Sequence, residues 1–131
     1  MRAAFQFALS FARSEKRGGI QQIIQHQAVG YALADAKTTI EAARVLSWHA
    51  CRALDTAAPG ALELAIHAKV FGSEAAVRVI TNLMQVVGVD SYGHELPLAG
   101  ASGRYVVAAF RWRQYRRSPP PVARAYARSR V

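Results

Sequence analysis

The chain has 131 residues, enough for one domain with a real core but small for an enzyme that must enclose both a cofactor and a substrate. Residues 1–100 carry nine basic and eight acidic side chains, a balance of +1, whereas residues 101–131 carry eight arginines and no acid, a balance of +8. The basic character therefore belongs to the C-terminal tail, and the near-neutral body gives no support for a nucleic-acid or membrane surface.

The cysteine content and the N-terminus bear on the compartment. Cys51 is the single cysteine, so no internal disulfide can form, which is compatible with a reducing compartment. No apolar run has the length needed to cross a bilayer. The first twelve residues offer one arginine and an apolar stretch, but Gln6 and Ser10 interrupt the stretch and no clean cleavage site follows, so a targeting peptide is disfavoured. We expect a cytoplasmic protein.

The first predicted helix covers residues 3–17. Phe5, Leu9 and Ala12 recur at helical spacing and should share one apolar side. The pair Gly18-Gly19 predicts its end, since glycine commonly terminates helices.

The second predicted helix is longer and runs from about residue 21 to 55. Charged side chains fall on one narrow stripe, and the opposite side carries small and aliphatic residues, namely Ala36, Ile40, Ala43, Ala50 and Leu54. Because small residues let neighbouring helices approach closely, this face predicts a tightly packed antiparallel bundle.

A turn at residues 56–60, which contains Pro59, should lead into a third helix at about residues 61–87, ended by Gly88. Its apolar positions at helical spacing are Leu62, Ala65, Ala76, Val79, Leu83 and Val86. Long helices joined by short loops, with nothing alternating at period two, predict an all-α fold with an up-and-down helical bundle.

The helices carry no standard catalytic motif. The four histidines lack partners at metal-ligand spacing and Cys51 lacks a second thiol, so no metal site is expected. Trp48 lies on the charged stripe of the second helix. Cover by a neighbouring helix or subunit is the favoured explanation for it, and stacking on a ligand is the alternative.

Three segments carry a family resemblance: QHQAVGYALADAKTTIEAAR at 25–44, HAKVFGSEAAVRV at 67–79 and MQVVGVDSY at 84–92. They resemble, in order and in spacing, consecutive parts of the C-terminal helical domain of the acyl-CoA dehydrogenase family. The match covers residues 3 to about 98. No one of these motifs is specific by itself, but the three together are strong.

The resemblance implies a FAD-dependent oxidoreductase that removes hydrogens from the α and β carbons of an acyl thioester. It also implies a homo-oligomer, or packing against the remaining domains of such an enzyme, with no membrane partner. The family's pyrophosphate-binding arginine corresponds to Arg17, or to Lys16 one residue earlier. The cofactor-binding residues carried over in this way are Arg17, Gln27, Gln85, Gly88 and Val89.

The resemblance fails in the tail. The family's later segment, which in many members holds the carboxylate that takes the α-proton, has no counterpart here, because no acid follows Glu95. We therefore assign no catalytic residue, and expect a fragment of an acyl-CoA dehydrogenase that is inactive alone. Residues 1–100 should form the helical domain, and residues 101–131 should be out of frame or disordered.

A shift of reading frame near residue 100 is the specific expectation. Codons for Ala101 to Gln114, read one nucleotide later, can give an Asp-Ala step and then, five residues on, an aromatic-acid-Gly-x-Asn step, which is the family's spacing. Two alternatives from other classes remain. The chain could be a helical dimerisation module that kept the family's dimer face, or an RNA- or DNA-binding protein acting through its arginine-rich tail.

Overall fold

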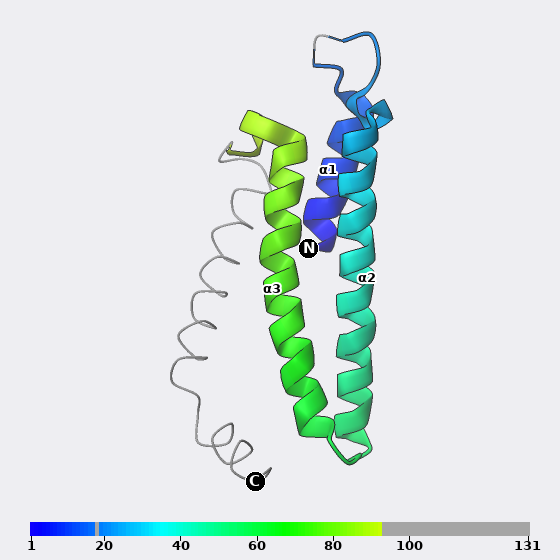
Figure 1. Ribbon diagram of the computed structural model, residues 1–131, viewed down its shortest axis with the longest axis vertical. Coiled ribbons are helices and arrows are strands. Elements are labelled where there is room, and N and C mark those ends of the chain that lie inside the picture. The colour runs from blue at the N-terminus through cyan, green and yellow to red at the C-terminus, as the bar shows by residue number, and fades with distance from the viewer. Residues whose placement is uncertain (18, 93–131) are drawn as a thin grey trace.

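The computed structural model describes residues 1–17 and 19–92, and the expectations for residues 101–131 lie outside this range. The described elements are α1 (Arg2–Ser14), the 3-10 turn η1 (Ile23–Gln25), α2 (Gln27–Asp55), α3 (Ala61–Val87) and the 3-10 turn η2 (Gly88–Tyr92). All five are helical, and the direction of the chain alternates from α1 to α2 to α3 (Figure 1). The predicted all-α, up-and-down arrangement is confirmed for these residues.

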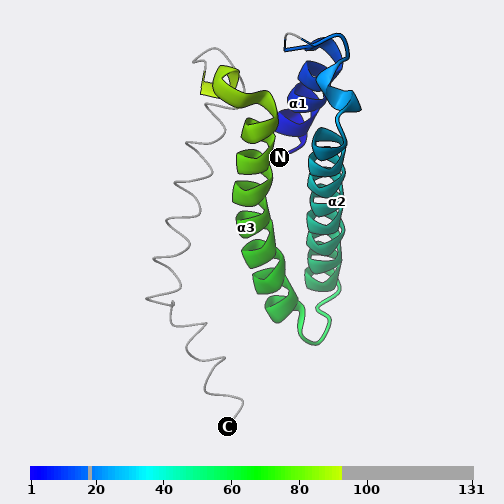
Figure 2. The same cartoon turned by 45° about the horizontal axis from the view of Figure 1, so that its top comes forward.

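The helices α2 and α3 form a long antiparallel hairpin, and α1 lies against only one half of it (Figures 1 and 2). The hairpin turn uses two residues with positive φ, Ala57 at 48° and Gly60 at 78°. Gly60 adopts this left-handed conformation without the penalty that a Cβ imposes. The turn at residues 56–60 and the third helix at residues 61–87 therefore form where the sequence predicts them.

Two helix ends differ from the prediction. The first helix stops at Ser14, three residues before its predicted end at residue 17, because Glu15 is extended and its carboxylate accepts the backbone N–H groups of Lys16 and Arg17. The second begins at Gln27 rather than near residue 21, since an extended Gln22 and the 3-10 turn η1 precede it. Local side-chain and backbone hydrogen bonds, rather than the glycine pair, therefore set the end of α1 and the start of α2.

The core lies where α1 packs on the α2–α3 hairpin. It joins Ala4, Phe5, Ala8 and Ala12 of α1 to residues of α2 and α3 that include Leu33, Ala36, Ile40, Val79, Ile80 and Leu83. On the apolar face predicted for α2, Ala36, Ile40, Ala43 and Ala50 are buried. Small side chains at these positions let the helix axes come close.

The prediction that Leu54 and Leu62 belong to the core is wrong. Leu54 and Leu62 are 49% and 52% exposed, although both fit the apolar periodicity of their helices. They flank the hairpin turn, at the end of the bundle that α1 does not reach (Figure 1). At this end only α2 and α3 are present, and two helices cannot fully enclose a side chain. Helical periodicity shows which face is apolar but not whether a third helix covers it, so it overestimates the core there.

Candidate functional site

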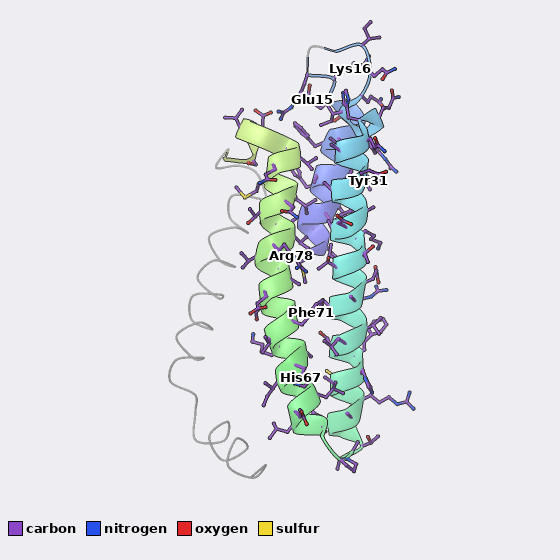
Figure 3. All side chains as sticks on the ribbon, in the orientation of Figure 1. Glu15, Lys16, Tyr31, His67, Phe71 and Arg78 are labelled. Carbon is purple, nitrogen blue, oxygen red and sulfur yellow. The ribbon has the colours of Figure 1, made fainter. Side chains whose placement is uncertain are left out.

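The five residues selected from the sequence all belong to one end of the bundle, where α2 begins and α3 ends. Arg17 lies in the loop that follows α1, as do Glu15 and Lys16, which Figure 3 labels at this end. Gln27 is the first residue of α2, Gln85 lies in the last turn of α3, and Gly88 and Val89 open η2. Folding therefore gathers residues that are far apart in the sequence.

The guanidinium of Arg17 is the best-defined group at this end. Its Nη2 donates a hydrogen bond to the carbonyl oxygen of Val87, 70 residues away, and lies 3.6 Å from Oδ2 of Asp90. Its Cζ lies 5.6 Å from the ring centroid of Phe11. Because the last carbonyls of a helix have no partner within the helix, Arg17 satisfies one of them and ties the loop to the end of α3.

The backbone of Arg17 is held by Glu15. Arg17 has a φ of 43°, in the left-handed region, and its N–H donates to Oε1 of Glu15 at 2.8 Å. The N–H of Lys16 donates to the same oxygen at 2.9 Å. These bonds, from Arg17 first and Lys16 second, lower the pKa of Glu15 from its ordinary value. An ionised Glu15 therefore stabilises the loop conformation that presents the arginine.

Gly88 faces Arg17 directly. Its φ of 72° and ψ of −145° lie in a region that is essentially restricted to glycine. A Cβ at this position would lie 2.6 Å from Nη1 of Arg17 and 2.8 Å from Nη2. The absence of a side chain thus allows both the turn at the end of α3 and the close approach of the guanidinium. Val89, the next residue, is 78% exposed.

The two glutamines are less constrained. Both side chains are exposed, and Gln27 donates from Nε2 to the hydroxyl of Tyr31 at 2.8 Å. Neither glutamine side chain hydrogen-bonds to Arg17 within the described residues, so the structure brings Arg17 and Gly88 together directly and places the glutamines only at the same end. Lys16, the alternative to Arg17, is exposed, and its charged group takes no part in these contacts.

Two residues of this end were missed from the sequence. Asp90 pairs with Arg17, and its position two residues after the assigned Gly88 was the available signal. Ser91 is fully buried, and its hydroxyl has no hydrogen-bond partner among the described residues. It therefore leaves one unmet hydrogen-bonding group beside Asp90.

This arrangement suits an anion. An arginine has five N–H donors, and the contacts described here engage only one nitrogen, Nη2, so donors remain for phosphate oxygens. The Arg17 side chain is 40% exposed, which leaves it accessible from outside. A phosphate-bearing cofactor such as FAD is therefore compatible with the residues present. Within residues 1–17 and 19–92, no cluster of three or more metal-ligating side chains occurs.

Trp48 lies on the outer face of α2, away from this end. It is 64% exposed, and Cζ of Arg44 lies 4.9 Å from its ring centroid. Val45, one turn earlier, is 59% exposed. No described helix of this chain covers Trp48, so cover by a subunit stays a prediction for it, with stacking on a ligand as the alternative. None of the described helices is long and apolar enough to span a membrane.

Comparisons with known proteins agree with the family resemblance of the sequence. A family model described as "Acyl-CoA dehydrogenase, C-terminal domain" matches residues 1–131. Nitroalkane oxidase of Podospora anserina is 40% identical over 111 residues, which are 82% of this chain and 26% of the relative. Mitochondrial short-chain specific acyl-CoA dehydrogenase of Bos taurus is 34% identical over 95 residues, 72% of this chain and 23% of the relative.

Solved structures agree with these similarities. A structure of the flavoprotein nitroalkane oxidase superposes with a TM-score of 0.76 at 36% identity, covering 79% of this chain and 25% of the other. The chain therefore spans about a quarter of the length of the relatives that it matches.

Proposed function

Because the chain belongs to the acyl-CoA dehydrogenase family, we propose that it serves as the helical C-terminal part of a FAD-dependent oxidoreductase. Its role there is to bind the outer, phosphate-bearing end of the cofactor and to pack against further domains or subunits. The observation that carries this proposal is the fixed, accessible guanidinium of Arg17 beside Gly88.

Each residue has a distinct part in this role. Arg17 donates hydrogen bonds to the pyrophosphate, with its position fixed by Val87 and its loop by Glu15. Gly88 offers backbone without an obstructing side chain, Val89 offers the next backbone group, and Gln27 and Gln85 offer amide groups at the same end. When bound, FAD supplies the acceptor for the hydride that leaves the substrate.

The substrate class proposed first is an acyl thioester, which would lose hydrogens from adjacent carbons. A nitroalkane is a second candidate, favoured by the 40% identity to the Podospora nitroalkane oxidase against 34% to the bovine acyl-CoA dehydrogenase. An activity assay distinguishes the two candidates. It uses the protein expressed together with any coding sequence that adjoins this chain, and compares a short-chain acyl-CoA with a short nitroalkane as substrate.

The 131-residue chain expressed by itself should catalyse neither reaction. Proton abstraction from carbon needs a positioned carboxylate. Asp90 at the proposed cofactor end is paired with Arg17, and Glu15 is engaged by the backbone N–H groups of Lys16 and Arg17. The chain therefore contributes binding, and the proposal assigns catalysis to residues outside it.

A titration with ADP, followed by backbone NMR, tests the cofactor-binding role. We expect shifts concentrated at Arg17 and Gly88, and their loss in Arg17→Gln. Arg52→Gln is the matched control, since Arg52 is an exposed arginine in the last turn of α2, at the opposite end of the bundle. Shifts that are absent from Arg17 and Gly88, or that persist in Arg17→Gln, would overturn the proposal.

A further inference from the structure

Asp90 lies beside Arg17 at the end of the bundle that carries the proposed cofactor-binding residues. Its Oδ2 is 3.6 Å from Nη2 of Arg17, and its side chain is 57% exposed. No feature of the sequence or of the proposed function assigns a role to this carboxylate.

Asp90 is not needed to hold Arg17 in place. The hydrogen bond to the Val87 carbonyl, the ring of Phe11 and the close approach to Gly88 already fix the guanidinium. An ion pair between side chains that are 40% and 57% exposed also contributes little to folding stability, because water screens it and ordering both side chains costs entropy.

Asp90 matters more for the electrostatic potential that a ligand meets at Arg17 than for the free energy of unfolding. Arg17 already faces the carbonyl end of α3, which carries partial negative charge. The carboxylate of Asp90 adds a full negative charge within ion-pair distance. An approaching phosphate therefore meets not only the guanidinium but also a like charge beside it.

We propose that Asp90 is an internal counter-ion of Arg17 that sets the affinity of this end of the bundle for phosphate-bearing ligands. The inference rests on the proposed function, in which Arg17 contacts the pyrophosphate. Asp90 acts through its charge on Arg17 and does not itself contact the reacting atoms. It holds the arginine paired until a polyanion displaces or outcompetes the carboxylate.

The test measures binding of inorganic pyrophosphate to the 131-residue chain by calorimetry or NMR. Asp90→Asn keeps the shape and removes the charge. We expect it to bind pyrophosphate about threefold to tenfold more tightly than the unmodified chain, because a like charge a few ångströms away is removed. Asp55→Asn, at the opposite end of α2, is the matched control and should leave the affinity unchanged.

Salt distinguishes charge from structure. The gain in Asp90→Asn should shrink between about 50 mM and about 500 mM NaCl, since screening weakens the repulsion that the variant relieves. A merely structural effect would persist at high salt and would lower the melting temperature. The double variant Arg17→Gln/Asp90→Asn should lose the gain, because Asp90 acts only through Arg17.

The outcomes separate the two proposals. Equal affinity of Asp90→Asn and the unmodified chain, with weaker binding by Arg17→Gln, would overturn the role of Asp90 and leave the cofactor-binding role intact. Equal affinity of Arg17→Gln and the unmodified chain would overturn the cofactor-binding role. No measurable binding by Asp90→Asn would also reject the role of Asp90, since that variant is the one expected to bind most tightly.

Discussion

Gly88 and Arg17 lie so close together that a Cβ on residue 88 would sit 2.6 Å from Nη1 of the arginine. This contact joins the loop after α1 to the end of α3, across most of the described chain. It makes one glycine responsible both for a helix end and for the position of the proposed ligand-binding side chain.

Gly88→Ala should destabilise the chain by about 1–3 kcal/mol, because its φ and ψ lie in a region that side chains rarely adopt. It should also displace Arg17, whose flexible end can move away, so ADP shifts at Arg17 should weaken. Urea unfolding measures the first effect. Gly30→Ala is the control, since a Cβ there meets nothing within 4 Å and the helical position favours alanine. A Gly88→Ala variant as stable as Gly30→Ala would contradict this prediction.

Glu15→Gln should reduce stability near neutral pH but not in acid. The pKa of Glu15 is lowered in the folded state, so its contribution is present above the ordinary value of 4.5 and is lost as the pH falls through the lowered value. The difference in melting temperature between the variant and the unmodified chain should therefore be present at about pH 7 and shrink as the pH falls into the acid range, where Glu15 takes up a proton. Glu74→Gln, an exposed position on α3, controls for the loss of a surface charge. A difference that is constant across this range would refute the role given to Glu15.

The 131-residue chain should self-associate through the outer face of α2. Exposed Val45 and Trp48 lie one turn apart there, and paired apolar residues of this exposure are typical of surfaces that bind protein. Val45→Lys combined with Trp48→Ala should shift sedimentation toward the monomer at about 50 µM, roughly the range in which exposed apolar surface associates. Leu62→Lys, near the hairpin turn, is the control. A stable monomer of the unmodified chain at that concentration would count against the prediction.

The purified 131-residue chain should be colourless. In the proposed function its residues contact only the outer end of FAD, so the isoalloxazine should gain few contacts to offset the cost of binding. A visible absorption spectrum taken after gel filtration checks this expectation. Stoichiometric flavin that survives the column would show that the described helices, or residues 93–131, enclose the ring.

The gene should contain a shift of reading frame near residue 100. The tail has eight arginines and no acid, and codons chosen for Ala101 to Gln114 can give the family-like motif when they are read one nucleotide later. Sequencing the gene decides the matter. An early stop codon in that second frame, or no acid-Gly-x-Asn motif there, would make the basic tail a genuine feature and revive the nucleic-acid-binding alternative.

The fold was largely readable from the sequence because its signals are local. Gly88 marks the end of α3 to the residue, Pro59 and Gly60 mark the hairpin turn, and the alanines of α2 mark its buried face. Leu54 and Leu62 were assigned wrongly because burial depends on a third helix, and the length of α1 depends on Glu15 accepting two backbone N–H groups rather than on the glycine pair.

The candidate site divides in the same way. Arg17 and Gly88 were selected by family resemblance, but their mutual contact, the hydrogen bond to Val87 and the pairing with Asp90 depend on how the loop after α1 meets the end of α3. No periodicity encodes a contact across 70 residues. The sequence by itself determined which residues form helices and which faces are apolar. Only the tertiary structure decided which carboxylate balances the arginine, because a Coulomb interaction depends on distance in space and not on separation along the chain.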